Sequence, residues 1–483
     1  MTTSSADRLR AIHAAPKGPT TGAFFDFDGT LIDGYSASYF YRRRIRDAEL
    51  GPRELLHTLA AVIRGIDTTE EFERLLALTL QAWTGYEVER LTELGEELFS
   101  SEIAGRLHTE VWELVEAHRE CGHHLVLASS ATRFQAGPMA RELAFRDLIC
   151  TEIESVDGRL TGRVAGKATW GEGKAEATRA LAALRDIDIR ASFAYSNGAE
   201  DIPFLQAVGN PVAVDPADAL RSAADEHGWP IFEVAEHRGS VLSSVKDITR
   251  TAALYGGVAG AVGVGLGIGA LHRSRRKALD MAFSLASDVG LGLAGIELEV
   301  IGAENLWAAR PAVFIFNHQS KLDVLIMMKL LRERFTGVVK REVADIPGWG
   351  QFFRFADVAF VERGNTEAAK RALAPAVAAI REQGISLVIS PEGTRSLTPR
   401  LGTFKKGPFH IAMQAEVPIV PVVLRNAGDI MWRSAQTVRS GKLEVCVLPP
   451  VDTSDWTPST LDDHVIALRD HIAWTLTHWP QEH

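Results

Sequence analysis

Two acidic residues, Asp26 and Asp28, stand two positions apart in the segment AFFDFDGT. Side chains at i and i+2 of an extended strand point the same way, so both carboxylates are expected at the carboxyl edge of one sheet. One carboxylate of such a pair can attack phosphorus while the other handles the leaving-group proton. A divalent cation must offset their mutual repulsion. The pair therefore predicts phosphoryl-transfer chemistry.

Three later segments offer partners for these carboxylates. LASSAT provides Ser129 and YSNGAED provides Asp201, each after an apolar run, and GEGK provides Lys174. A hydroxyl, an ammonium and a further carboxylate are the groups that a phosphate–magnesium site requires.

A different chemistry is indicated by FNHQSKLDV, in which His318 follows an apolar run and Asp323 comes five residues later. Acyl transfer to a hydroxyl needs a base of near-neutral pKa, and imidazole meets that need. A nearby carboxylate can hold the imidazole in one tautomer and favour the imidazolium as it forms. His–Asp pairs are common, however, and this one alone is weak evidence for catalysis.

Arginines in two further segments strengthen the case. FVERGN (360–365) carries Arg363 and SPEGTRS (390–396) carries Arg395, and each segment follows a hydrophobic run. A guanidinium at a strand-to-helix turn, beside exposed backbone N–H groups, is typical of phosphate binding. Taken singly, each arginine would more often form a surface ion pair. KRE (340–342) and FKKG (404–407) add further cations.

The elements that must position these residues fall into regions of different composition. From 22 to 235, apolar runs at 23–29, 123–130 and 191–198 predict buried parallel strands between helical stretches. The roughly 90 residues between the first two runs are rich in Leu, Arg and Glu, which predicts a helical insertion at about 34–120. Residues 296–483 alternate strands with amphipathic helices, a second α/β layout. Residues 1–21 are polar and are expected to be a loose lead-in.

Between the two α/β regions, residues 236–295 are predicted to be a linker and membrane-associated helices. The uncharged stretch 251–271 is long enough to cross a bilayer, which takes ~20 apolar residues, and the basic segment HRSRRK (272–277) follows it. A flexible glycine-rich linker is the alternative. The stretch 281–296 is shorter and contains Asp288, which predicts an interfacial or partly buried helix. Spanning, re-entrant and surface-lying arrangements all remain open.

Glycine pairs in the stretch 251–271 keep a four-residue spacing that allows close helix packing in lipid. The pairs are Gly256/Gly260, Gly263/Gly267 and Gly265/Gly269. This spacing permits a homodimer through the helix and equally permits packing on the second apolar helix.

Composition sets outer limits. A chain of 483 residues predicts two or three domains, and its net charge of −10 argues against a general nucleic-acid binder. Three scattered cysteines and the lack of an apolar leader predict a reducing compartment, with catalytic domains at a membrane and facing the cytoplasm.

Four motifs in order carry a resemblance: N-H-x4-D, F-x-x-R, P-E-G-T-R-S and V-P-I-V-P. Over most of 296–430 the chain resembles the lysophosphatidate acyltransferase family. The resemblance implies that His318 deprotonates the sn-2 hydroxyl of 1-acylglycerol 3-phosphate, oriented by Asp323, with acyl-CoA or acyl-carrier protein as donor. The residues implied to hold the acceptor phosphate are Arg363, Glu392, Gly393, Thr394 and Arg395, with Lys340 as a helper.

The D-x-D-G-T segment and its partners resemble the haloacid dehalogenase superfamily, in its phosphoserine-phosphatase-like branch with a helical cap, over about 22–235. This implies a Rossmann-like fold with Asp26 as nucleophile and Asp28 as acid/base. Ser129 and Lys174 would hold phosphate. Magnesium would lie on Asp26, Asp28, Asn197 and Asp201.

Asn197 departs from this resemblance, because the branch usually has an aspartate there. An amide oxygen can coordinate magnesium but brings no charge. The leading hypothesis is therefore a phosphatase-like module joined to a phospholipid-synthesis acyltransferase. The alternatives are a catalytically weak N-terminal domain that binds or regulates, a non-catalytic membrane scaffold, and a different lipid or glycolipid acceptor.

Overall fold

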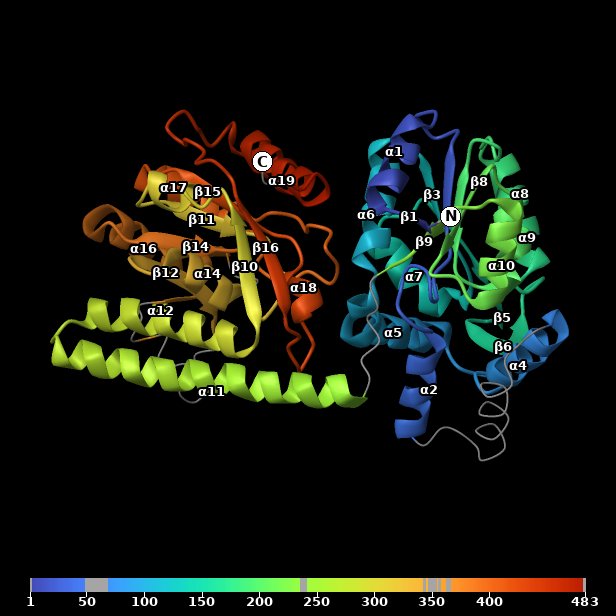
Figure 1. Cartoon of the computed structure of the whole chain (residues 1–483), viewed down its shortest axis with the longest axis horizontal. Coiled ribbons are helices and arrows are strands. Elements are labelled where there is room, and N and C mark those ends of the chain that lie inside the picture. Colours follow the sequence, from blue (N-terminus) through green and yellow to red (C-terminus); the bar gives the residue numbers. More distant parts are fainter. Residues whose placement is uncertain are drawn as a thin grey trace. The chain divides into compact units, whose positions relative to one another are not determined.

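The structure is a computed structural model that describes residues 2–47, 68–234, 241–341, 345, 354, 358–361 and 366–480. The chain divides into two compact units, 1–238 and 239–483, and each unit is built on its own sheet (Figure 1). The expected α/β class with two α/β domains is confirmed.

The sheet of the first unit has seven strands in the order β1-β9-β8-β7-β2-β3-β4, all paired in parallel. The three predicted strands are its β2, β3 and β7. The strands are β1 Thr2–Thr3, β2 Gly22–Phe25, β3 His124–Thr132, β4 Asp147–Thr151, β7 Phe193–Ser196, β8 Asn210–Val214 and β9 Ile231–Phe232. The helices that cover them are α1 Ser5–Ala14, α6 Thr109–Glu120, α7 Arg133–Glu142, α8 Glu172–Leu184, α9 Ile202–Gln206 and α10 Asp218–His227.

The N-terminal lead-in is folded, contrary to the expectation of a loose segment. Ser4 and Asp7 form a capping box that starts α1, because each side chain accepts a hydrogen bond from the other's backbone N–H. Ile12 on α1 is buried, the helix packs against α6, and β1 pairs with β9. The polar composition of this segment led to the wrong prediction, although the capping residues Ser4 and Asp7 are a sequence signal for the start of a helix.

The helical insertion is present but ends earlier than predicted. Its elements are α2 Ala37–Arg46, α4 Thr69–Gln81, α5 Val88–Leu98 and the turns Phe99–Ile103 and Ala104–Arg106. The next helix, α6, packs against α1 and β3 and so belongs to the layer that covers the sheet. A hairpin of β5 Ile153–Val156 and β6 Arg159–Val164, distant in sequence, packs on α4.

The second unit has a seven-stranded sheet in the order β10-β16-β15-β11-β14-β12-β13, parallel except for the β15–β16 pair. The alternation of strands and helices expected for 296–483 is present. The strands are β10 Ile296–Ile301, β11 Val313–Phe316, β12 Phe335–Lys340, β13 Ala359–Val361, β14 Ser386–Ile389, β15 Ile419–Leu424 and β16 Gly441–Val447. The helices around it are α13 Asn305–Ala308, α14 Asp323–Leu331, α16 Thr366–Gln383, α17 Gly407–Ala415, α18 Ala427–Ile430 and α19 Leu461–Thr477.

Two long antiparallel helices, α11 Val241–Leu271 and α12 Arg275–Leu293, open this unit. Figure 1 shows α12 between α11 and the sheet, and α12 packs on α14 and β10. Of the predicted glycine pairs, Gly265 and Gly269 meet Ala282 and Ala278 of α12 so closely that a Cβ would clash. Small residues thus hold the two backbones together.

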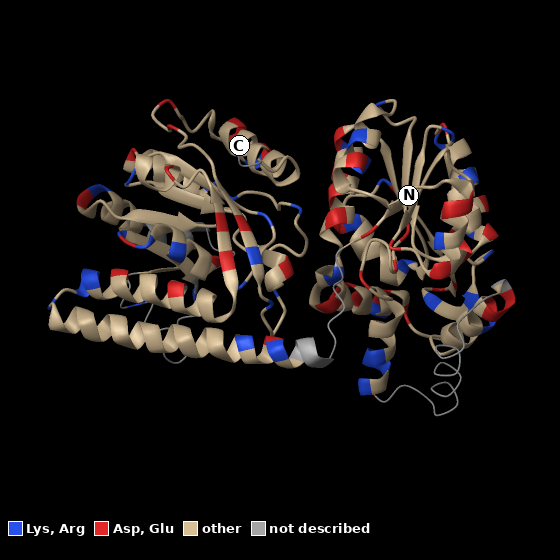
Figure 2. Ribbon diagram, in the orientation of Figure 1, with Lys and Arg blue, Asp and Glu red and all other residues tan. Residues whose placement is uncertain are grey.

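The outer side of α11 is apolar and largely uncovered. The stretch Val245–Leu271 has a mean hydropathy of 1.7, and only 28% of its most apolar part is buried. Charged residues occur near its start and in the turn before α12, with none along the helix between (Figure 2). By length and composition α11 could cross a membrane, which agrees with the prediction of a membrane-associated segment.

Candidate active sites

The first candidate site lies where β2 ends and is organised by a buried lysine. Lys174, from the first turn of α8, places Nζ 2.6 Å from Asp26 Oδ1 and 2.5 Å from Asp201 Oδ2. Its side chain is only 1% exposed. Ser196 at the end of β7 also donates to Asp201, at 2.6 Å. Two of the predicted acidic residues and the predicted lysine therefore form one buried cluster.

Burial and the neighbouring charges shift the pKa values of the residues in this cluster. Burial, and then the carboxylate of Asp201, raise the pKa of Asp26 to about 7 in spite of the Lys174 ammonium. Burial likewise raises the pKa of Asp28 to about 6. Although burial opposes its charge, Asp201 and Asp26 raise the pKa of Lys174. One ammonium thus faces three carboxylates, and the cluster is short of positive charge.

Asp28 is bonded to the start of the helical insertion. Its two oxygens accept from Ser36, Oδ1 from the backbone N–H at 2.7 Å and Oδ2 from the hydroxyl at 3.0 Å. Ser129 is buried beyond the part of β3 that pairs with β2, and its Oγ accepts from the backbone N–H of Ala131 at 3.0 Å. Both residues lie at the predicted sheet edge.

The oxygen donors present fit a magnesium ion. Thr30 Oγ1 lies 3.1 Å from both Asp26 Oδ2 and Asn197 Oδ1, so these two oxygens converge on one point. Magnesium takes oxygen ligands and often only one or two carboxylates, with water and phosphate completing its shell. Within the described residues, no three His, Cys, Asp or Glu side chains form a metal-ligand group. Asp201, predicted as a ligand, anchors Lys174, and its role toward a metal stays a prediction.

The second candidate site is the turn after β11. His318 Nδ1 donates to Asp323 Oδ2 at 2.7 Å, and Asp323 also accepts from the backbone N–H groups of Gln319 and Ser320 at 2.8 and 2.9 Å. Asp323 is fully buried at the start of α14, whereas the His318 side chain is 22% exposed. Because Nδ1 carries the proton that Asp323 accepts, Nε2 is left as the basic nitrogen.

Glu392 holds this turn in place, a role that its predicted part in phosphate binding did not include. Its Oε1 accepts from the backbone N–H of His318 and its Oε2 from that of Gly402, both at 2.9 Å. The residue is 5% exposed, and burial raises its pKa. A carboxylate with both oxygens bonded to backbone N–H groups is a positioning residue for His318.

The rest of the PEGTRS turn is close by. Ser396 donates its backbone N–H to His318 O at 2.7 Å, which places Thr394 and Arg395 beside the histidine turn. Gly393 has a φ of +67°, and a Cβ there would approach Lys405 Nζ to 3.0 Å. Arg395 directs Nη1 to Arg433 O at 3.1 Å. Lys340 ends β12, and Arg363 lies outside the described residues, so their phosphate roles stay predictions.

Several residues that build the two sites were not predicted. Thr30 and Ser36 hold the acidic pair, and Asn317 ties the histidine turn to β15 through two bonds with Leu424, at 2.8 and 2.7 Å. Thr30 and Asn317 belong to the quoted motifs D-x-D-G-T and N-H-x4-D, so the motif letters were the available signal. Ser36 carried none.

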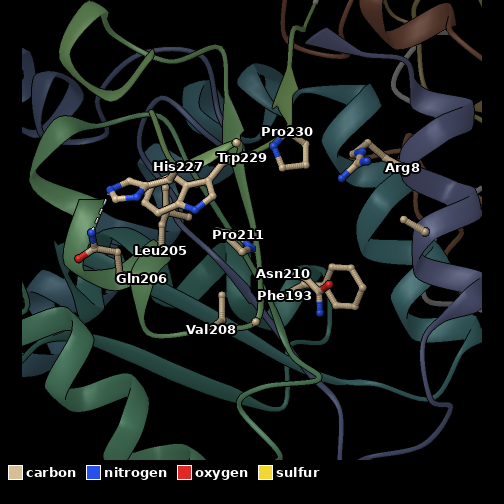
Figure 3. A pocket seen from close by; sticks show the side chains of 13 residues that line it. Arg8, Phe193, Leu205, Gln206, Val208, Asn210, Pro211, His227, Trp229 and Pro230 are labelled. Atoms are coloured by element: carbon tan, nitrogen blue, oxygen red, sulfur yellow. Dashed lines mark hydrogen bonds between the residues drawn. The ribbon is translucent and has the colours of Figure 1, made fainter. Parts of the chain in front are cut away.

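A pocket of about 600 Å³ in the first unit lies at the other edge of the sheet, where β7 and β8 begin (Figure 3). Phe193 and Asn210 line it from those strands, opposite Arg8 of α1 and the stacked rings of His227 and Trp229. None of the predicted site residues lines this pocket. This pocket is therefore separate from the carboxylate cluster.

Comparison with known proteins gives two family matches. The model for haloacid dehalogenase-like hydrolases matches residues 23–206, and the acyltransferase model matches residues 297–425. A phosphoserine phosphatase of Mycobacterium tuberculosis is 34% identical over 222 residues, which is 45% of this chain and 72% of that protein. The chain belongs to the haloacid dehalogenase-like hydrolases and carries an acyltransferase domain behind the hydrolase domain. Both resemblances inferred from the sequence are thus confirmed.

The acyltransferase domain has relatives of its own. The 1-acyl-sn-glycerol-3-phosphate acyltransferase of Limnanthes alba is 38% identical over 179 residues, which is 37% of this chain and 63% of that protein. The chain thus spans less than two thirds of that relative's length. The solved 1-acyl-sn-glycerophosphate acyltransferase of Thermotoga maritima is 23% identical, and the match covers 49% of this chain and 99% of that one with a TM-score of 0.43.

Proposed function

We propose that the acyltransferase domain moves an acyl group to the sn-2 hydroxyl of 1-acylglycerol 3-phosphate, with acyl-CoA or acyl-carrier protein as donor. The observation that carries this proposal is the His318–Asp323 pair, with Nδ1 bonded to the carboxylate and Nε2 left basic. Nε2 takes the hydroxyl proton as the oxygen attacks the thioester carbon. Asp323 stabilises the imidazolium that results, and the thiol of the donor leaves.

Recognition of the acceptor falls to the cations around this turn. Arg395 lies beside the histidine turn because Ser396 bonds to His318. Its guanidinium suits the 3-phosphate, since a planar fork can bind two phosphate oxygens at once. Arg363, Lys340 and the Gly393–Thr394 backbone are proposed to share that phosphate.

The α11–α12 hairpin is proposed to seat the domain on the cell membrane with both catalytic domains on the cytoplasmic side. α12 is packed into the acyltransferase core and α11 is packed along α12, which favours an arrangement in which the two helices meet the bilayer together. Insertion turn-first would bury Arg273, Arg275, Arg276 and Lys277, at roughly 2.5–3.5 kcal/mol each near the bilayer centre. A surface-lying hairpin instead buries the exposed apolar side chains and leaves the basic turn at anionic headgroups.

A homodimer through α11 is a further proposal with narrower support. Gly265 and Gly269 are already packed on α12, whereas Cβ atoms added at Gly256, Gly260, Gly263 and Gly267 would meet no atom within 4 Å. That open stripe is the surface a second copy could use.

The hydrolase domain is proposed to hydrolyse a phosphomonoester with magnesium. Asp26 attacks phosphorus, the bond to the leaving oxygen breaks, and Asp28 gives the leaving group its proton. Water then attacks the phosphorus of the aspartyl phosphate, Asp28 takes the proton of that water, and Asp26 and inorganic phosphate are released. The pKa of about 6 for Asp28 suits that proton transfer near neutral pH. Lys174 and Ser129 hold phosphate, and Asp26 and Asn197 would hold the metal, which balances charge. A catalytically weak, regulatory hydrolase domain is the alternative.

A crossed pair of variants tests both proposals in the full-length protein. We expect His318→Ala to lower acyl transfer from acyl-CoA to 1-acylglycerol 3-phosphate by at least ~10²–10⁴-fold and to leave phosphomonoester hydrolysis unchanged. Asp26→Asn should show the reverse. Undiminished acyl transfer in His318→Ala would contradict its role as base. Hydrolysis that is absent from the wild type with magnesium would favour the regulatory alternative.

A further inference from the structure

The loop 431–438, between α18 and β16, contacts three separate parts of the acyltransferase domain. It lies beyond residues 297–425, which the acyltransferase model matches. Its residues bond to the histidine turn, to the PEGTRS turn and to α11. A short loop that reaches both catalytic turns and the candidate membrane helix is a place where the three can be aligned.

The first set of contacts fixes the histidine turn. Ser320 donates its hydroxyl to Met431 O at 2.6 Å, and Lys321 donates Nζ to Ala435 O at 2.8 Å. Ser320 also gives its backbone N–H to Asp323. The loop therefore holds the residues between His318 and Asp323 from outside.

The second set fixes the PEGTRS turn. Trp432 donates Nε1–H to Leu397 O at 2.9 Å. Arg395 and Arg433 bond reciprocally, each guanidinium donating to the other's carbonyl, at 3.1 and 2.7 Å. These bonds set the direction of the Arg395 guanidinium. Burial, and then the nearness of Arg395, lower the pKa of Lys321, which places the two cations in one neighbourhood.

The third contact ties the loop to α11. Val438 is fully buried and donates its backbone N–H to Thr251 Oγ1 at 2.9 Å. Thr251 is the first residue of the uncharged stretch of α11 and anchors its hydroxyl on Asp247 O at 2.6 Å. A buried N–H without an acceptor is unfavourable, so loss of this hydroxyl should displace the loop.

We infer that the 431–438 loop is a positioning element for acyl transfer, through which Trp432 and Thr251 hold Arg395 and the histidine turn in register with α11. The inference rests on the proposed acyltransferase function and gives it a specific mode of support. Because Arg395 is assigned to the acceptor phosphate, a loosened loop weakens binding of the phosphate-bearing acceptor more than binding of acyl-CoA.

The test compares two variants with two controls in full-length protein on vesicles of phosphatidylcholine and phosphatidylglycerol. Trp432→Phe removes the Nε1–H, and Thr251→Val removes the hydroxyl at nearly constant shape. Thr251→Ser keeps the hydroxyl, and Trp474→Phe changes an exposed tryptophan of α19. We expect Trp432→Phe and Thr251→Val to raise KM for 1-acylglycerol 3-phosphate about tenfold, equivalent to ~1.4 kcal/mol. KM for acyl-CoA and vesicle flotation should stay unchanged, and both controls should match the wild type.

Equal effects on both KM values, or none, would overturn the inference. Hydrogen exchange supplies a second readout that needs no turnover and so separates this inference from the proposed function. The amides of Gln319, Ser320 and Ser396, which are bonded within the two turns, should exchange faster in Trp432→Phe and Thr251→Val than in the controls. Unchanged exchange there would also overturn the inference, even if the wild type transferred no acyl group to this acceptor.

Discussion

The hydrolase domain and the acyltransferase domain both bury carboxylates beyond the carboxyl end of a sheet strand, and they balance the charge by different means. Asp26 and Asp201 share one side-chain cation, Lys174. Among the described residues, Asp323 and Glu392 accept mainly from backbone N–H groups, with His318 as their one side-chain donor. The first arrangement depends on one long side chain, that of Lys174. The second depends on backbone N–H groups, whose positions follow from the path of the chain.

This difference suits the two proposed reactions. The hydrolase cluster has one ammonium for three carboxylates, so a magnesium ion can complete its charge balance. The acyltransferase pair is complete before substrate binds, since the proposed reaction needs only a base that is correctly oriented. Substitutions at the two sites should therefore fail in different ways, one in stability and metal response, the other in rate.

The largest effect is expected from Asp323→Asn. The amide can still accept at the position of Oδ2, but it brings no charge to stabilise the imidazolium. We expect acyl transfer to fall by roughly 10³–10⁴-fold. Initial rates with acyl-CoA measure the change, and Asp462→Asn, at an exposed ion pair on α19, is the matched control. A rate within tenfold of the wild type would show that the carboxylate is not needed for orientation or charge.

A loss of stability confined to the hydrolase domain is expected from Lys174→Met. The change leaves Asp26 and Asp201 buried without their cation, at a cost of roughly 3–5 kcal/mol. Hydrogen exchange of the β2, β3 and β7 amides measures this cost within the intact chain. Lys167→Met, at an exposed lysine paired with Glu176, should have little effect.

The stability deficit of Lys174→Met against the wild type is expected to grow as pH rises. The pKa of Asp26, already about 7 beside Lys174, should rise further once the ammonium is gone. A carboxyl whose pKa is raised on folding stabilises the protein below its unfolded value near 4, and this contribution is lost as pH rises through the folded value. The deficit against the wild type should therefore be larger at pH 8 than at pH 5. A stability deficit that became smaller with rising pH would show that Asp26 does not carry the unpaired charge.

The sequence predicted most of this layout because motif residues occur at strand ends. AFFDFDG, LASSAT and YSNGAED each marked a strand of the parallel sheet, and the sites follow from where those strands end. The apolar stretches 251–271 and 281–296 marked the two helices of the hairpin, whose α11–α12 contact uses the predicted Gly265/Gly269 pair. Periodicity and motif spacing are local signals, and the positions of these strands and helices follow mainly from such signals.

What could not be predicted depends on contacts between distant residues. Glu392 belongs to a phosphate-binding motif by its letters, but only the folded chain brings its oxygens to the backbone of His318 and Gly402. Ser36 reaches Asp28 by a turn that has no sequence signature. The capped helix at 5–14 was masked by its polar composition. Side-chain direction within a known motif is set by tertiary packing, which spacing does not encode.

The smallest and most discriminating effect is expected from Asn197→Asp. Asn197 Oδ1 and Asp26 Oδ2 meet at the Thr30 hydroxyl, whose single proton can serve only one of them. A carboxylate at this position adds a negative charge where the cluster already lacks positive charge. It should lower stability in EDTA and lower the magnesium concentration for half-maximal phosphate hydrolysis by about tenfold, since a charged ligand binds the cation more strongly. Gln81→Glu, at the exposed end of α4, adds the same charge away from the site as a control. If magnesium response stayed the same while stability in EDTA fell, residue 197 would be a structural neighbour of the cluster and not a metal ligand.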